Sequence, residues 1–180
     1  MRVGILTISD AGARGERRDT SGDAAERWAR DRGYEVAVRT LIPDDTTQIV
    51  AVLSTWCDED RADLVLTTGG TGLSARDFTP EATQAVLDRE APGIAERIRA
   101  LSLESFPRAA LSRGKAGTRA RTLIVNLPGS TSGVNDGLVA LEPIVDHAVS
   151  VVRGERLDHG ESGESGESGE QGPSSTTTRA

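Results

Sequence analysis

The chain has 180 residues and a formal net charge of −7. Six acidic residues and two arginines follow Gly154, so this tail carries −4 and the preceding residues only −3. A nearly balanced folded part gives no electrostatic reason to expect a nucleic acid or an anionic membrane as partner. The single cysteine, Cys57, excludes an internal disulfide, and no apolar run approaches the ~20 residues of a membrane span. We expect a cytoplasmic protein without a signal peptide.

The composition divides the chain into two parts. Residues 1–153 have the composition of an ordinary globular domain, whereas residues 154–180 contain Gly-Glu-Ser three times in succession. Such a segment cannot bury enough apolar surface to offset its ordering entropy. We expect one folded domain followed by a disordered, acidic tail that acts as a passive solubilising segment.

Strands and helices alternate in the first half of the domain. An apolar, β-branched run predicts a buried strand at the start, and apolar residues at helical spacing predict two helices. Gly33 stands where a helix commonly ends in a glycine. The expected elements are a strand at Val3–Ile8, a helix from about Gly22 to Arg32, a strand at Glu35–Ile42 and a helix at Thr46–Asp58.

The alternation continues in the second half. Thr79 and Pro80 are typical of a helix start, with the threonine as N-cap and the proline in the first turn. The expected elements are a strand at Asp63–Thr68, a helix from Thr79 to about Arg89, a helix from Pro92 to about Leu103, a strand at Thr122–Leu127 and a helix from about Val134 to Val152.

This order of elements predicts the fold class. Strands that alternate with helices form parallel βαβ units, and hence a three-layer α/β/α sandwich around a mostly parallel sheet. Ligands of such sheets bind beyond the carboxyl ends of the strands. The glycine-rich and acidic loops of this chain all follow predicted strands, so a binding site is expected at that edge.

The run from Thr67 to Gly72 (TTGGTG) is the first candidate site element. Consecutive glycines after a strand allow backbone amides to turn toward an anion and a phosphate to approach closely. The spacing matches neither a Walker loop nor a dinucleotide fingerprint. An ordinary tight turn is the alternative interpretation.

Two aspartates follow at comparable positions. Asp44 comes directly after the second strand, and Asp77 lies five residues beyond the glycine run. Neighbouring carboxylates repel one another unless a cation lies between them, and Mg²⁺ binds one or two carboxylates together with phosphate oxygens. Helix capping is the alternative. We expect capping for Asp45, because a helix follows directly.

Two further loops carry groups that suit an anion. Ser112 and Arg113 precede a strand in a basic loop, where the arginine offers a bidentate fork; a solvated surface loop is the alternative. Asn126 to Gly129 places an amide and a glycine turn at the end of the last strand. Cys57 is interpreted as a packing residue, and no histidine cluster or catalytic triad is visible in the sequence.

Together these segments resemble the molybdopterin adenylyltransferase family, which includes MogA- and MoaB-like proteins and the G domain of gephyrin. The resemblance spans most of residues 1–153, and the glycine run followed at fixed distance by Asp and Thr-Pro-Glu-Ala is its most specific part. The tail has no counterpart in the family pattern. The residues that carry the resemblance are Ile8–Asp10, Asp19–Gly22, Leu41–Asp44, Thr67–Gly72, Asp77–Thr83, Leu111–Arg113 and Asn126–Gly129.

The resemblance implies an activity. Members join AMP from Mg²⁺-bound ATP to the terminal phosphate of molybdopterin and release pyrophosphate. The family's essential acidic pair matches Asp44 and Asp77, which are expected to hold Mg²⁺ and orient the triphosphate. The residues expected to contact pterin and phosphates are Ser9, Asp10, Thr68, Gly69, Gly70, Thr71, Gly72, Ser112, Arg113, Asn126, Pro128 and Gly129.

The resemblance also implies a trimer or hexamer, and a separate partner protein that inserts the metal. The alternative is a molybdopterin carrier without catalytic activity. A carrier has no need of two carboxylates suited to a metal, so Mg²⁺-dependent ATP binding separates the two hypotheses.

Overall fold

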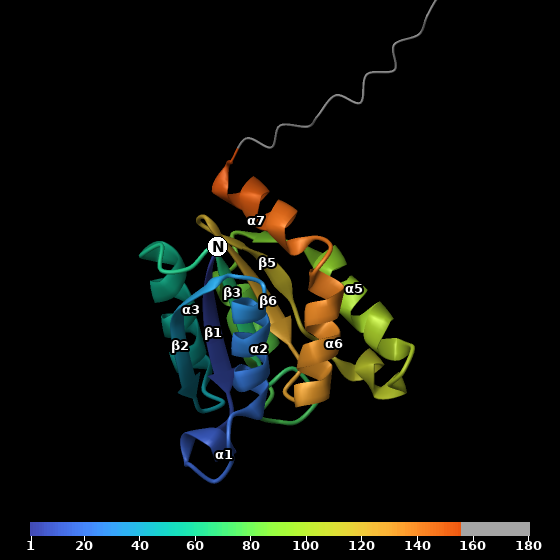
Figure 1. The fold of residues 1–180 in the computed structure, drawn as a ribbon. Coiled ribbons are helices and arrows are strands. Elements are labelled where there is room, and N and C mark those ends of the chain that lie inside the picture. The colour runs from blue at the N-terminus through green and yellow to red at the C-terminus, as the bar shows by residue number, and fades with distance from the viewer. Residues whose placement is uncertain (156–180) are drawn as a thin grey trace, which may run out of the picture.

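The computed structural model describes residues 1–155. A six-stranded sheet lies at its centre, in the order β2-β1-β3-β6-β5-β4 (Figure 1). The expected tail lies outside the described residues. The strands are β1 (Arg2–Ile8), β2 (Glu35–Ile42), β3 (Leu64–Thr68), β4 (Arg89–Glu90), β5 (Ala116–Arg119) and β6 (Thr122–Leu127).

Four strands form the parallel part that the sequence predicts. β2, β1, β3 and β6 are parallel, and their side chains alternate between two separate cores because successive residues of a strand point to opposite faces. β5 and β4 add an antiparallel edge, so the expectation of a mostly parallel sheet is confirmed. The structure differs from the sequence reading at Ala116–Arg119, which we expected to be a loop and which pairs with β6.

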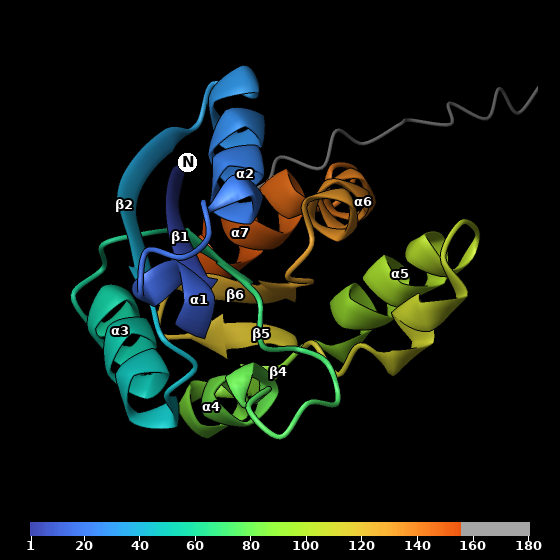
Figure 2. The same cartoon turned by 90° about the horizontal axis from the view of Figure 1, so that it is seen from below.

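Helices cover both faces of the sheet, which confirms the three-layer sandwich (Figure 2). α3 and α4 pack on one face, and α2, α5, α6 and α7 pack on the other. The helices are α1 (Asp10–Ala13), α2 (Thr20–Asp31), α3 (Thr46–Asp58), α4 (Thr79–Val86), α5 (Pro92–Leu103), α6 (Thr131–Leu141) and α7 (Val145–Arg153), and a 3-10 turn follows α5 at Pro107–Leu111.

Two helix predictions were wrong in their extent. Phe78 is the N-cap of α4, so Thr79 is its first residue and does not cap it. The helix ends at Val86 because Arg89 and Glu90 leave it to pair with β5. The helix expected from Val134 to Val152 is two helices, α6 and α7. Pro143 separates them, because its ring lacks an N–H and clashes with the preceding turn.

No helix among residues 1–155 combines the length and the apolar character needed to cross a membrane.

Cys57 is 2% exposed, and burial raises the pKa of its thiol to about 11. The thiol therefore packs in the core in its neutral form, as expected for this residue.

Candidate active site

Backbone atoms form the floor of the candidate site, where β1, β3 and β6 end. Gly69 and Gly70 have φ values of +100° and +62°, which L-residues with side chains rarely adopt. A Cβ at Gly69 would lie 2.2 Å from the carbonyl oxygen of Ile8, and one at Gly129 would lie 3.1 Å from the Cα of Gly69. The three strand ends are thus packed backbone against backbone.

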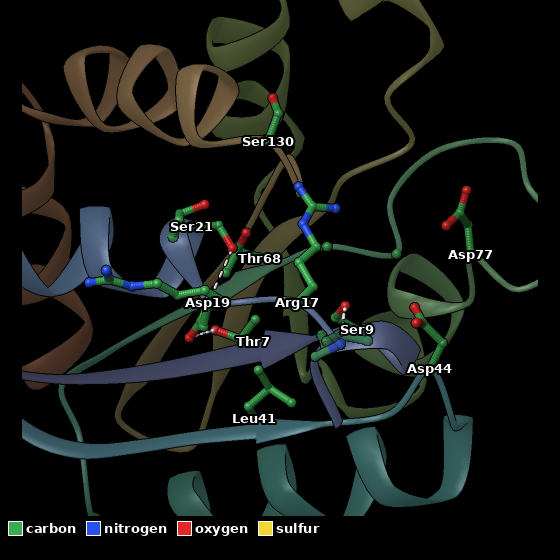
Figure 3. Close-up of a pocket in the computed structure, with 17 residues that line it drawn as sticks. Thr7, Ser9, Arg17, Asp19, Ser21, Leu41, Asp44, Thr68, Asp77 and Ser130 are labelled. Atoms are coloured by element: carbon green, nitrogen blue, oxygen red, sulfur yellow. Dashed lines mark hydrogen bonds between the residues drawn. The ribbon is translucent and has the colours of Figure 1, made fainter. Parts of the chain in front are cut away.

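The two predicted aspartates flank this floor. A Cβ at Gly70 would lie 3.0 Å from Oδ1 of Asp44, and one at Gly72 would lie 2.9 Å from Oδ2 of Asp77. Both residues line the cavity, and Figure 3 shows them on the same side of it. Asp45 instead caps α3, accepting a hydrogen bond from the Gln48 amide at 2.9 Å, as predicted.

Asp10 holds Asp44 in place. The Asp10 amide donates to Oδ2 of Asp44 at 2.8 Å, and the Asp44 amide donates to Oδ1 of Asp10 at 3.1 Å. Burial raises the pKa of Asp44, and the negative charges of Asp10 and Asp77 add to that effect. Arg76 pairs with both Asp10 oxygens at 3.0 and 2.9 Å, which lowers the pKa of Asp10. Asp44 therefore lies where a cation would relieve unfavourable charge.

A cavity of about 310 Å³ opens above the floor, and we call it the first cavity. Its walls come from the end of β1, the loop before α2, the N-terminal turn of α2 and the loop after β2 (Figure 3). Besides Asp44 and Asp77, its polar lining consists of hydroxyl groups, two arginines and a third carboxylate. These include Thr7, Ser9, Arg17, Arg18, Asp19, Ser21, Thr68 and Ser130.

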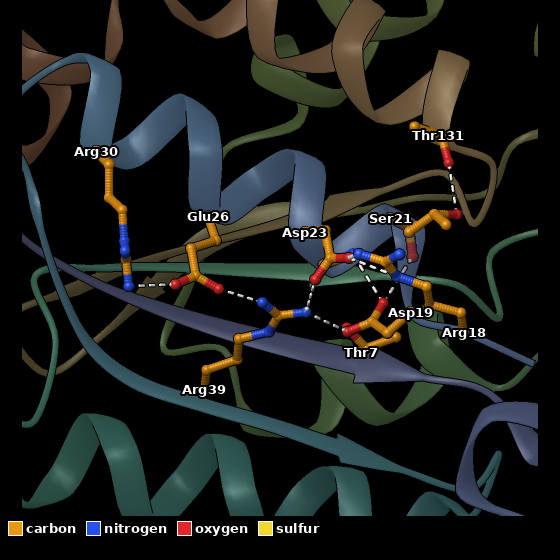
Figure 4. A network of polar contacts seen from close by, with 11 residues as sticks. Thr7, Arg18, Asp19, Ser21, Asp23, Glu26, Arg30, Arg39 and Thr131 are labelled. Atoms are coloured by element: carbon orange, nitrogen blue, oxygen red, sulfur yellow. Dashed lines mark hydrogen bonds and ion pairs between the residues drawn. The ribbon is translucent and has the colours of Figure 1, made fainter. Parts of the chain in front are cut away.

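An ion-pair network supports the α2 wall (Figure 4). Arg39 on β2 donates to Asp19 at 2.9 Å and to Asp23 at 2.8 Å, and it also pairs with Glu26. Asp19 caps α2 through the Gly22 amide at 2.8 Å. Burial raises the pKa of Asp19, but Arg39 and these hydrogen bonds outweigh it, so the pKa lies below its usual value. The network fixes an anionic Asp19 in the cavity wall.

A second cavity of about 540 Å³ lies on the other side of the floor. It shares Gly70, Asp77, Gly129 and Ser130 with the first, so a ligand that fills both passes over the glycine loop. Its remaining walls are α5, the 3-10 turn after it and the N-terminal turns of α6, which pack against one another. The second cavity is less polar than the first.

The sequence-predicted residues fall into three groups. Ser9, Asp44, Thr68, Gly69, Gly70, Asp77 and Gly129 line the first cavity, and Gly70, Thr71, Gly72, Asp77, Ser112, Pro128 and Gly129 line the second. Asp10, Arg113 and Asn126 line neither.

All three support the loops of the site, Asp10 through its hydrogen bonds with Asp44. Arg113 donates to the carbonyl oxygens of Gly72 and Asp77 and pairs with Glu81, so it clamps the segment between the glycine loop and α4. Asn126 is 3% exposed and lies at the carboxyl end of β6, beneath the loops.

Sequence reasoning did not select several wall residues. Arg17, Asp19 and Ser21 lie in a polar stretch without periodicity, and the wall residues of α5 and α6 are read simply as parts of helices. The one available signal was Asp19-Thr20-Ser21-Gly22, which carries part of the family resemblance.

A parallel α/β sandwich with a glycine floor and two carboxylates at the strand ends is typical of proteins that bind phosphorylated ligands. The particular family follows from comparison with known proteins. Residues 4–147 match the family model described as a probable molybdopterin binding domain, and the chain belongs to this family.

Similar proteins cover nearly all of the described chain. A molybdopterin adenylyltransferase of Helicobacter pylori J99 is 36% identical over 89% of this chain and 93% of its own length. The protein of that name from Escherichia coli K12 is 41% identical over 84% of this chain and 77% of its own.

Among solved structures, the molybdopterin biosynthesis enzyme MoaB of Thermus thermophilus is 53% identical. Its TM-score is 0.81, over 85% of this chain and 96% of that one. The tungsten cofactor synthesizing protein MoaB of Pyrococcus furiosus is 33% identical, with a TM-score of 0.76 over 84% and 96%.

Proposed function

We propose that this protein is a molybdopterin adenylyltransferase, which transfers AMP from ATP to the terminal phosphate of molybdopterin and releases pyrophosphate. The observation that carries the proposal is the pair of cavities that meet over one glycine floor, next to Asp44 and Asp77. Two substrates that react through their phosphates need two binding compartments with a shared anion-binding junction. The names of the relatives support the same reaction.

The reaction joins two phosphate groups. An oxygen of the pterin phosphate attacks the α-phosphorus of ATP, a new P–O bond forms, and the bond to the β-phosphate bridging oxygen breaks as pyrophosphate leaves. Such a transfer needs positioning and charge neutralisation more than covalent help from the protein. The amides of the glycine loop and the N-terminal turn of α6 suit the phosphates at the junction, and Arg17 and Arg18 suit the outgoing pyrophosphate.

Asp44 and Asp77 suit a Mg²⁺ ion in this reaction. Both carboxyl groups border the first cavity. Burial raises the pKa of Asp44, and the negative charges of Asp10 and Asp77 raise it further, which a cation would offset. Two carboxylates leave most ligand positions for phosphate oxygens and water, which is the usual arrangement for Mg²⁺ with nucleotides. Bound there, the ion would neutralise charge on the triphosphate.

The test is a turnover assay with purified protein, molybdopterin, ATP and Mg²⁺ that follows adenylylated molybdopterin and pyrophosphate. Asp44→Asn and Asp77→Asn should each lose most of the activity while remaining folded. Asp45→Asn is the matched control, because it changes the neighbouring carboxylate and asparagine is an equally good helix cap. It should keep wild-type activity.

Two results would contradict these expectations. A wild-type protein that binds molybdopterin but forms no adenylylated product, and binds no ATP in the presence of Mg²⁺, is a carrier and not a transferase. Equal activity of the Asp44→Asn and Asp45→Asn proteins would assign the acidic pair to loop structure alone.

We further propose that the protein acts in the cytoplasm, where ATP is available, as a homotrimer or hexamer that passes its product to a separate metal-insertion protein. Family resemblance supports the oligomer, and light scattering of the purified protein tests it. A monomer at micromolar concentration would refute it.

A further inference from the structure

Asp44 and Asp77 each have one oxygen held by the protein and one oxygen without a partner. Oδ2 of Asp44 accepts from the Asp10 amide at 2.8 Å, and Oδ2 of Asp77 accepts from the Ser74 amide at 2.8 Å. Within residues 1–155, Oδ1 of neither carboxylate takes part in a hydrogen bond or an ion pair. A hydrogen bond to one oxygen fixes the direction of the other, so each aspartate presents one oriented oxygen to a ligand.

The two aspartates belong to separate loops. Asp44 follows the end of β2, whereas Asp77 lies far along the loop that joins β3 to α4. Arg113 anchors the Asp77 loop to the segment before β5, through the carbonyl oxygens of Gly72 and Asp77. That anchor does not reach the β2 loop, so it leaves the separation of the two aspartates open.

Arg76 connects the two loops. Its guanidinium donates to both oxygens of Asp10, at 3.0 and 2.9 Å, and Asp10 exchanges two hydrogen bonds with Asp44. Arg76 immediately precedes Asp77, so a short series of contacts runs from one predicted metal ligand to the other. Among the described residues, no other hydrogen bond or ion pair joins residues 71–78 to the loops after β1 and β2. A two-point contact of this kind fixes an angle as well as a distance.

The charge of Arg76 and the bridge that it makes have opposite effects on a bound cation. Burial raises the pKa of Asp44, and the positive charge of Arg76 opposes that rise, so the arginine is close enough to act on the site. By charge alone Arg76 would weaken the binding of a cation between the two aspartates, because like charges repel. The bridge favours binding, because it holds the two oriented oxygens at one spacing before the cation arrives. Removal of Arg76 therefore distinguishes the two effects by their sign.

We infer that Arg76 is a positioning residue that, through Asp10, sets the spacing of Asp44 and Asp77 and thereby favours Mg²⁺ over a larger cation. This inference deepens the proposed function and rests on the metal role assigned there to the two aspartates. Mg²⁺ requires near-ideal octahedral geometry with oxygens at about 2.0–2.1 Å, whereas Ca²⁺ accepts a variable shell at about 2.3–2.6 Å. A site whose two carboxylates move freely relative to one another loses more affinity for Mg²⁺ than for Ca²⁺.

Metal binding in the absence of nucleotide and pterin tests the inference. The probe is Mn²⁺, which takes an octahedral oxygen shell like that of Mg²⁺. Electron paramagnetic resonance follows free Mn²⁺, and its displacement by Mg²⁺ or Ca²⁺ gives the affinities for those ions. Arg76→Met should bind Mn²⁺ and Mg²⁺ about tenfold more weakly than wild type, the usual effect of losing a partner of a metal ligand, and Ca²⁺ should weaken by a smaller factor. The melting temperature should stay close to that of wild type, because an exposed ion pair contributes little to stability.

Further variants separate geometry from charge. Arg14→Met is the matched control, because Arg14 is as exposed as Arg76, makes a two-point contact with Glu16 and carries its charge near Asp10. Arg14 makes no contact with the Asp77 loop, so this variant should bind Mn²⁺ at least as tightly as wild type. Arg76→Lys keeps the charge without the two-point contact and should resemble Arg76→Met. Combined with Asp10→Asn, Arg76→Met should cause no further loss, because the arginine acts only through Asp10.

The inference fails if Arg76→Met binds Mn²⁺ as tightly as wild type or more tightly, which is the result expected from charge alone. It also fails if Arg76→Met weakens the binding of α,β-methylene-ATP to the same extent in EDTA as in Mg²⁺, because Arg76 would then contact the phosphates itself. A wild-type protein that binds no Mn²⁺ would refute the metal role of the acidic pair and this inference with it. A protein that shows the expected metal binding but forms no adenylylated product would contradict the proposed function and leave the role of Arg76 intact.

Discussion

Asn126 should contribute more to stability than to ligand affinity. Its side-chain amide donates to the hydroxyl oxygens of Thr67 and Thr83, both at 2.9 Å, and its carbonyl oxygen accepts from the Lys115 amide at 3.0 Å. These bonds join β6 to β3, α4 and the start of β5. Each such bond contributes about 1 kcal/mol net, so Asn126→Ala should lower the free energy of unfolding by about 3 kcal/mol. For a domain of this size that corresponds to a fall in Tm of about 6–12 °C.

Urea unfolding measures the change directly. The midpoint should fall for Asn126→Ala with an unchanged m-value, because the folded and unfolded surfaces stay similar. Asn135→Ala is the control, since Asn135 is exposed on α6 and should change stability by no more than about 0.5 kcal/mol. A loss below about 1 kcal/mol for Asn126→Ala, together with weaker pterin or ATP binding in the folded protein, would falsify this reasoning. Asn126 would then be a ligand contact, as the sequence analysis expected.

Two further predictions concern the floor and the α2 wall. Gly69→Ala should cost more than about 3 kcal/mol, because its Cβ would meet a backbone oxygen, whereas Gly15→Ala, with φ +72° and open space around it, should cost about 1 kcal/mol; similar melting temperatures would show that the floor relaxes. Arg39→Met should lose about 2 kcal/mol at pH 7, between the values for exposed and buried ion pairs. Asp19 and Asp23 have lowered pKa values in the folded state, so the stability that Arg39 provides is present above the unfolded pKa of about 4 and is lost as pH falls through the folded values. The two melting curves should therefore converge in acid, and a gap that stays constant down to a pH of about 2.5 would contradict the ion-pair explanation.

Elements with a strong local pattern were predictable from the sequence. β2, α3, α5 and β6 have the predicted bounds, because apolar runs and helical spacing at those positions coincide with the burial of the folded protein. β5 has no such pattern. Its residues Ala116–Arg119 become a strand only through pairing with β6, which a window of local sequence does not contain. The break at Pro143 was visible in the sequence but was outweighed by the apolar spacing on both sides.

The site was predictable to a similar extent. The glycine loop and Asp44 follow closely on the ends of β3 and β2, and Asp77 belongs to the same loop region after β3. The rule that ligands bind at the carboxyl ends of the strands therefore brings them together. Asp19 gains its position from Arg39, 20 residues away. The α5 and α6 walls of the second cavity lie together only because these two helices pack against each other. Such contacts depend on the tertiary fold and leave no spacing signal in the sequence.

The glycine floor has a consequence for how binding preference diverges in this fold. The backbone at Gly69, Gly70 and Gly129 leaves almost no room for any side chain, so substitution there damages the fold before it alters selectivity. The walls come from separate elements, α2 on one side and α5 with α6 on the other. Redesign toward a different nucleotide or a different heterocycle should therefore vary one wall at a time and leave the strand ends untouched.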